Sequence, residues 1–82
     1  MLALAAAGCG GSKTPAEKVA GCLNHQRFLV QADGGSVRGS SPGGIVFAVV
    51  VATGRIDDAT NPGGRRLSAT DRGAVNGCLA RR

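Results

Sequence analysis

The chain has 82 residues, of which 14 are Gly and only two are aromatic, both of them Phe. This length leaves room for one small domain and excludes barrel enzymes and dinucleotide-binding folds with a separate substrate domain. The net charge is +5, but the Arg and Lys residues form no block and the two Phe lie among aliphatic residues, so the charge does not favour nucleic-acid binding.

The first residues are apolar or small and end at Cys9, which is the pattern at the end of a secretory signal. A segment that spans a bilayer needs about 20 apolar residues, and this stretch is shorter. Ala6-Ala7-Gly8-Cys9 resembles the lipobox of bacterial lipoproteins, and residues 10–13 resemble their flexible tether. In that family the Cys thiol is diacylated, and the chain is then cut before the Cys, next to small residues.

The resemblance implies three segments along the chain. Residues 1–8 are the remnant of a signal peptide, residues 9–13 hold the lipidated Cys9 and the tether, and residues 14–82 form a single domain. Ala6 stands where the family prefers Leu, three residues before the Cys. The family's basic region and longer apolar core are missing ahead of it, so we expect the protein to start further upstream. An apolar end with an incidental Cys is the alternative. The expected location is extracytoplasmic, anchored to the bacterial cell membrane.

A first helix is predicted to begin after Thr14. Thr14 suits the cap, Pro15 suits the first helical position, and Glu17 completes a Thr-x-x-Glu capping box. The apolar stripe that follows has the i, i+3, i+4 spacing of one helix face and consists of Val19, Cys22 and Leu23. We expect the helix to end near residues 24–26.

Extended segments separated by turns are predicted next. Residues 27–32 form a strand, residues 33–35 a hairpin turn and residues 36–39 a short returning strand. After a turn cluster at residues 40–44, Ile45–Ala52 forms the strongest strand, with two apolar faces. These faces consist of Ile45, Phe47, Val49 and Val51, and of Val46, Ala48, Val50 and Ala52. Such a strand is central, or a partner covers its second face, which would mean self-association or a bound apolar group.

The segment that follows is polar. Residues 53–66 are rich in turn formers and predict a loosely held loop, with one helical turn at residues 56–59. Residues 65–68 predict a short strand. The last helix is predicted over residues 70–80, with Ser68 or Thr70 as its cap. Its apolar stripe consists of Val75, Cys78 and Leu79.

The same Val-x-Gly-Cys-Leu sequence occurs in both predicted helices, at residues 19–23 and 75–79. Each Cys lies on the apolar stripe of its helix, and the Gly before it allows another backbone to approach. We therefore predict that the helices pack side by side and that Cys22 bonds Cys78, which an extracytoplasmic chain permits. The chain has three cysteines, and if Cys9 is lipidated, Cys22 and Cys78 remain to form the pair.

A bridge between the two helices would matter because the core is small. Only 18 residues are Leu, Ile, Val or Phe, and a core of this size rarely supplies more than about 3–5 kcal/mol on its own. Closing the loop between Cys22 and Cys78 would add about 4 kcal/mol in the chain-entropy model. Buried free thiols in a cytosolic protein are the alternative.

Other chemistry at these residues has weaker support. Cys22, His25 and Cys78 give three zinc ligands and lack a fourth, unless Cys9 joins them. Cys22 as a nucleophile with His25 as its base lacks any sign of a pocket or an oxyanion site. The Asp pair at residues 57–58 fits turn chemistry better than cation binding. We therefore expect no catalytic residue, no cofactor and no metal site.

These features predict an α+β fold in the order helix, two or three antiparallel strands, loop, helix, with both helices on one face of the sheet. The paired helices resemble those of small secreted or lipid-anchored proteins of high-GC bacteria. The resemblance implies a non-enzymatic, lipid-anchored protein with a structural or partner-binding role at the cell envelope. A small basic cytosolic module that binds nucleic acid is the alternative, motivated by the net charge.

Overall fold

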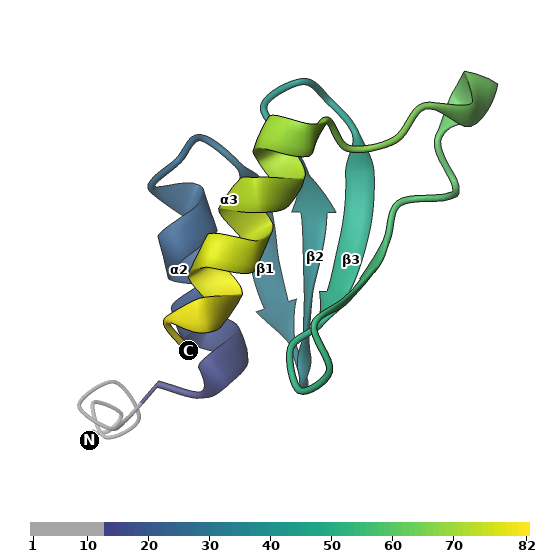
Figure 1. Cartoon of the computed structure of the whole chain (residues 1–82). Coiled ribbons are helices and arrows are strands. Elements are labelled where there is room, and N and C mark those ends of the chain that lie inside the picture. The colour runs from purple at the N-terminus through teal and green to yellow at the C-terminus, as the bar shows by residue number, and fades with distance from the viewer. Residues whose placement is uncertain (1–12) are drawn as a thin grey trace, which may run out of the picture.

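The computed structural model describes residues 13–82, so the predictions for the signal remnant and for Cys9 lie outside the described residues. The described chain contains two α-helices, four strands and one short 3-10 turn (Figure 1). In chain order these are α2 (Pro15–Asn24), β1 (Leu29–Asp33), β2 (Ser36–Ser40), β3 (Val46–Val50), β4 (Arg55–Asp57), η1 (Pro62–Gly64) and α3 (Ala69–Ala80).

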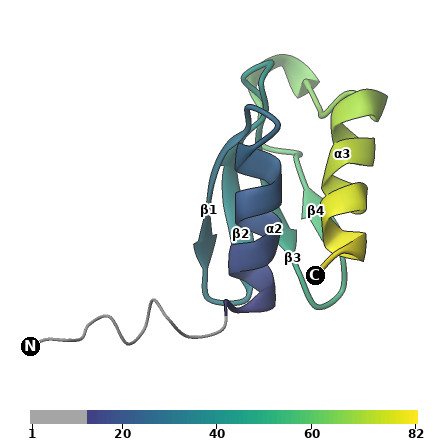
Figure 2. The same ribbon diagram turned by 90° about the vertical axis from the view of Figure 1, so that its left-hand side faces the viewer.

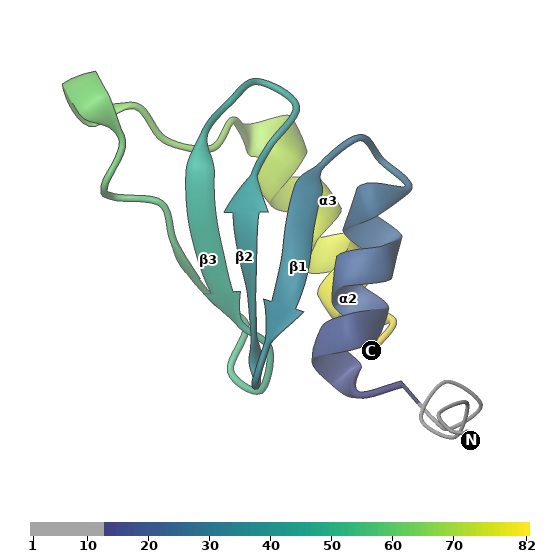
Figure 3. The ribbon, with the colours of Figure 1, turned by 180° about the vertical axis from the view of Figure 1, so that it is seen from behind.

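The four strands form one antiparallel sheet in the order β1-β2-β3-β4, so each strand pairs with its neighbour in the sequence. Both helices lie on the same face of this sheet, as the views from the front, the side and behind show (Figure 1, Figure 2, Figure 3). The predicted α+β class and the placement of the helices are therefore confirmed. The sheet has one strand more than the two or three predicted.

The helix α2 begins at the predicted capping box. The N–H of Glu17 donates to Thr14 Oγ1 at 3.2 Å, and the N–H of Thr14 donates to Glu17 Oε1 at 2.8 Å. At the other end, the carbonyl of Leu23 accepts a hydrogen bond from the N–H of Phe28. Between them, Arg27 has a φ of 71°, a conformation that no other non-Gly residue adopts in the described range. This turn leads the chain from α2 into β1.

The helix α3 begins at Ala69, one residue before the predicted start. The N–H of Asp71 donates to Ser68 Oγ at 3.1 Å, so Ser68 is the cap. The buried residues of α3 are the predicted stripe of Val75, Cys78 and Leu79. In α2, Val19 and Leu23 are fully buried, and the two helices are in direct contact. Packing of the two stripes thus holds the helices together.

Two glycines shape the first hairpin. Gly34 has a φ of 63° in the two-residue turn that joins Asp33 to Ser36, where a Cβ would be strained. Gly39 lies in β2, and a Cβ placed on it would overlap the carbonyl oxygen of Leu29 in β1. The close approach of β1 and β2 therefore depends on the missing side chain of Gly39.

The core lies between the helices and the inner face of the sheet. The rings of Phe28 and Phe47 meet edge to face with their centroids 5.8 Å apart. Of the two apolar faces predicted for the strongest strand, one is buried, and it consists of Ile45, Phe47, Val49 and Val51. The other core residues are Ala16, Val19, Ala20, Leu23, Phe28, Val30, Val37, Leu67, Val75, Cys78 and Leu79. Every buried side-chain nitrogen or oxygen in residues 13–82 has a hydrogen-bond partner.

The segment at residues 53–66 is held more firmly than the sequence predicts. It contains the strand β4 where a helical turn at residues 56–59 was expected, because Ile56 packs against the core while its two neighbours face outward. After β4, the side chains of Asp58 and Asn61 are buried and hydrogen-bonded. These contacts attach the loop to β3 and to the start of α3.

Two further predictions are wrong. Residues 65–68 form no strand, because the N–H of Leu67 donates to the carboxylate of Asp58 and not to a neighbouring strand. Gly21 and Gly77 do not bring two backbones together, since a Cβ on either residue would meet nothing within 4 Å. The helices therefore meet through their apolar side chains and not through these glycines.

Candidate interaction surface

The face of the sheet opposite the helices is a broad exposed surface, which we call the open face. Along each strand its side chains alternate with buried ones, as the pleat of a strand requires. The open face consists of Leu29, Gln31 and Asp33 from β1, Ser36, Arg38 and Ser40 from β2, Val46, Ala48 and Val50 from β3, and Arg55 and Asp57 from β4.

Strand register arranges these residues in three rows that run across the sheet. The first row consists of Leu29, Ser40 and Val46. The second row consists of Gln31, Arg38, Ala48 and Asp57. The third row consists of Asp33, Ser36, Val50 and Arg55. Each row therefore mixes small, apolar and polar side chains.

Large apolar side chains are exposed on this face. Leu29 is 76% exposed, Val46 54% and Val50 42%. They lie on β1 and β3, on either side of β2, whose side chains on this face are those of Ser36, Arg38 and Ser40. Apolar groups that gather on one exposed surface are typical of interaction sites. A partner that covers the second face of Ile45–Ala52 stays a prediction, and the open face is the surface where it would bind.

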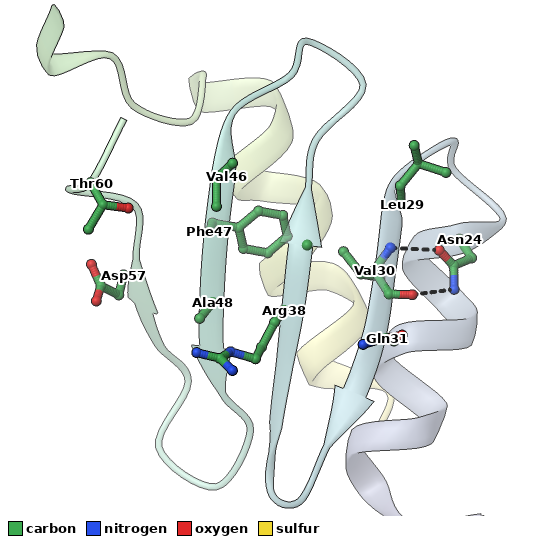
Figure 4. A pocket seen from close by; sticks show the side chains of 11 residues that line it. Asn24, Leu29, Val30, Gln31, Arg38, Val46, Phe47, Ala48, Asp57 and Thr60 are labelled. Atoms are coloured by element: carbon green, nitrogen blue, oxygen red, sulfur yellow. Dashed lines mark hydrogen bonds between the residues drawn. The ribbon is translucent and has the colours of Figure 1, made fainter. Parts of the chain in front are cut away.

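Figure 4 shows a hollow over the first and second rows of the open face. Its lining includes Leu29, Gln31, Arg38, Gly39, Val46, Ala48 and Asp57. The hollow is open to solvent above the sheet. Ligand pockets usually bury about 70–90% of the surface of a small molecule, and a hollow on a flat sheet does not enclose one in this way. The shape therefore suits a partner with a broad surface better than a small ligand.

The open face carries two positive and two negative side chains. Arg38 Nη1 lies 3.2 Å from Asp33 Oδ2, and both side chains are more than half exposed. An exposed ion pair of this kind contributes about 0–1 kcal/mol to stability. The other two charges, Arg55 and Asp57, lie on the opposite edge of the face, on β4. All four charged side chains are exposed, so pairing with a partner would cost the fold little.

Two Asn side chains occupy the strand edges beside this face. Val30 donates its N–H to Asn24 Oδ1 at 3.1 Å, and Asn24 Nδ2 donates to the carbonyl of Val30 at 3.0 Å (Figure 4). Asn61 forms the same two bonds with Val46, at 2.8 and 2.9 Å. Each amide takes the place of one residue in an additional strand, so it blocks edge pairing there. A partner would therefore contact the face and not these edges.

The two helices bring Cys22 and Cys78 together, as predicted. The Sγ atoms are 2.01 Å apart and the Cα atoms 5.7 Å apart, which are disulfide distances. The side chain of Gln26 lies over the pair, with its Nε2 atom 3.3 Å from Cys78 Sγ. The predicted pairing is confirmed in space. Cys9, the predicted lipidation site, lies outside the described residues.

The pairing of the cysteines bears on the other roles considered for them. A cysteine in a disulfide is neither a nucleophile nor a zinc ligand. His25 is exposed at the end of α2. Between residues 13 and 82, no group of three or more His, Cys, Asp or Glu side chains is placed to hold a metal ion. Neither helix in this range is long and apolar enough to cross a membrane.

Asp58 anchors the loop before α3, a role that the sequence did not indicate. The residue is 2% exposed. Its Oδ2 atom accepts hydrogen bonds from the N–H of Leu67 at 2.9 Å and from Arg72 Nη2 at 2.7 Å, and its Oδ1 atom lies 3.5 Å from Arg66 Nη1. The Leu67 hydrogen bond and the two Arg charges hold the pKa of Asp58 below its ordinary value of 3.8, against the effect of burial.

Comparison of the chain with protein-family models, with curated proteins and with solved structures gave no match. An assignment of function therefore rests on the residues and geometry of the chain itself. Two features carry it: the cysteine arrangement and the open face.

Proposed function

We propose that the protein is a lipid-anchored, non-enzymatic component of a bacterial cell envelope, attached to the membrane through Cys9. The folded domain binds a partner through the open face. The location and the anchor follow from the resemblance of Ala6-Ala7-Gly8-Cys9 to a lipobox. The partner-binding role follows from the uncovered second face of a strand that is apolar on both sides.

The cysteine arrangement is the observation that carries the anchor. The chain has three cysteines, and Cys22 and Cys78 lie at disulfide distance. Disulfides persist in oxidising compartments outside the cytoplasm. Cys9 is then left over beside small residues and a Gly-Gly-Ser tether, where lipidation accounts for it. The pairing and the lipobox thus support the same compartment from independent parts of the chain.

The layout of the open face supports binding over catalysis. Its polar side chains are spread along three rows and do not converge on one point. Nucleophilic and acid–base catalysis need a nucleophile, a base and an orienting group within hydrogen-bond reach of each other. The exposed apolar side chains of Leu29, Val46 and Val50 instead suit burial against a partner.

Metabolic labelling with an alkynyl fatty acid tests the anchor. The gene is expressed with its native upstream DNA, as wild type, as Cys9→Ser and as a matched Cys22→Ser, Cys78→Ser double variant. We expect label and membrane association for the wild type and the double variant, and loss of both for Cys9→Ser. Label that persists in Cys9→Ser, or unlabelled wild type in the soluble fraction, contradicts the proposal.

Intact mass tests the compartment. Protein isolated under alkylating conditions should show no alkylation at Cys22 and Cys78 and should gain about two mass units on reduction, the two hydrogens that reduction adds to a disulfide. Free thiols at both positions would instead support the cytosolic alternative. That alternative also requires binding to an oligonucleotide that weakens steeply as salt is raised.

A further inference from the structure

We propose that the partner on the open face is a second copy of this chain, bound face to face about a two-fold axis. This inference rests on the proposed partner-binding role of the open face. A two-fold axis that runs parallel to the strands, between β2 and β3, places β1 opposite β4 of the other copy. It also places β2 opposite β3. Each row of one copy then faces the same row of the other, and in the first row, which β4 does not reach, Leu29 lies beyond the end of β4 of the other copy.

The side chains of β2 and β3 match in size under this operation. Ser40 faces Val46 of the other copy in the first row, and Ser36 faces Val50 in the third. In the second row the long side chain of Arg38 faces the small Ala48. At all three positions a small side chain therefore meets a larger one, which is how the inner faces of two packed sheets interdigitate.

The charges at the two edges of the open face also match. In the third row, Asp33 on β1 faces Arg55 on β4 of the other copy. In the second row, Gln31 faces Asp57, and the long side chain of Arg38 on the next strand can also reach that carboxylate. Because the axis is two-fold, each pair occurs twice. Opposite charges meet at both edges, and no like charges lie directly opposite each other.

The other two-fold axis in the plane of the sheet gives a worse match. An axis perpendicular to the strands places the first row opposite the third, so that Leu29 faces Asp33 of the other copy. It also sets Arg38 opposite itself, although it brings the apolar Val46 and Val50 together. Burying an apolar side chain against a carboxylate and pairing like charges are both unfavourable. The residue pattern therefore favours the axis parallel to the strands.

The size of the open face sets the strength of the dimer. Three strands of five residues and one of three, about 4.8 Å apart and with about 3.4 Å per residue, cover on the order of 300 Å². Stable interfaces bury about 800 Å² on each partner, so the dimer is weak in dilute solution. Attachment of both copies to one membrane raises their local concentration towards the millimolar range, as a short linker does. The anchor would thus promote the dimer.

Sedimentation equilibrium on the full chain tests this inference, in a Cys9→Ser background that excludes an adventitious intermolecular disulfide. The loading concentration is raised to about 1 mM, the range that tethering provides. We expect the chain with an unchanged open face to dimerise reversibly. Asp33→Arg and Arg55→Asp should each weaken dimerisation at least tenfold, because each brings like charges together twice. Arg65→Asp, off the open face, is the matched control and should leave dimerisation unchanged.

Mixing the two charge-reversal variants gives the decisive result. An Asp33→Arg chain and an Arg55→Asp chain restore opposite charges at both edges only when they pair with each other. We expect the mixture to form a heterodimer as stable as the wild-type dimer, while each variant alone keeps the circular dichroism and melting curve of the wild type. A chain that stays monomeric at every concentration overturns the inference, and so does a mixture that fails to associate. Fatty-acid labelling of Cys9 does not depend on whether the chain dimerises, so it tests the proposed anchor separately.

Discussion

The side chain of Asn61 pairs with both backbone polar groups of Val46. The N–H of Val46 donates to Asn61 Oδ1 at 2.8 Å, and Asn61 Nδ2 donates to the carbonyl of Val46 at 2.9 Å. Asn24 does the same for Val30 at the opposite edge of the sheet. Neither Asn belongs to a strand, yet each supplies the hydrogen bonds that a strand would supply.

Asn61→Ala should destabilise the fold more than Asn24→Ala. Asn61 is 8% exposed, and its removal takes two hydrogen bonds from Val46 and a buried one from the carbonyl of Asp58. We expect a loss of roughly 1–3 kcal/mol in the free energy of unfolding. Asn24 is exposed, and water can replace its two bonds there. Urea unfolding of both variants measures the difference, and equal losses would contradict this account of burial.

Asp58 should make stability depend on pH in the acid range. Its pKa in the folded chain lies below the ordinary value of 3.8, so the ionised form favours the folded state. This contribution is complete above about pH 4 and is lost as the pH falls through the lower, folded-state pKa. Urea midpoints of the wild type and of Asp58→Asn, measured from pH 7 to pH 2, test this.

We expect Asp58→Asn to cost about 1–3 kcal/mol at pH 7, because charged hydrogen bonds are lost. The difference in urea midpoint between Asp58→Asn and the wild type should become smaller as the pH falls. Asp57→Asn, which removes an exposed carboxylate from the same segment, controls for net charge. A gap that stays constant over the whole pH range would show that Asp58 acts through its shape and not through its charge.

Substitution of glycines by Ala should have opposite effects at two positions. Gly39→Ala places a Cβ against the carbonyl of Leu29 and should separate β1 from β2, with a loss above about 2 kcal/mol, since the clash is with backbone. Gly77→Ala meets open space on α3 and should stabilise by roughly 0.5–1 kcal/mol. Thermal melts of both variants give the signs, and a tolerated Gly39→Ala would contradict the close approach.

Reduction of the Cys22–Cys78 bridge should remove a large part of the stability. The chain-entropy model gives about 4 kcal/mol for a loop of this length. The Cys22→Ser, Cys78→Ser double variant should resemble the reduced wild type in urea. A reduced protein that unfolds at the same urea concentration as the oxidised protein would show that the core alone holds the fold.

Local patterns predicted the helices and the main strands. The capping box at Thr14, the apolar stripes and each copy of the Val-x-Gly-Cys-Leu sequence are patterns of a few neighbouring residues, so they can be recognised in the sequence. Alternation along Ile45–Ala52 predicted which side chains share a face, but not which of the two apolar faces is buried. The turn role expected of Asp57 also holds, because its Oδ1 atom accepts from the N–H of Ala59 at 3.3 Å.

Contacts between distant segments could not be predicted in this way. The strand β4 has only Ile56 as an apolar residue, and it exists because β3 offers an edge to pair with. Asp58 meets Arg72 across 14 positions, and Asn61 meets Val46 across 15. In the sequence both residues resemble ordinary turn residues. Only the fold brings them to their partners.

The position of the two cysteines has a consequence for proteolysis. They are 56 positions apart in the sequence, and all four strands lie between them. With the bridge formed, a single cut in the exposed residues 62–66 leaves two fragments that are still covalently joined. Such a nicked protein would run as one band on a gel until reductant separates it, and its two helices would remain in register while the peptide bond is missing.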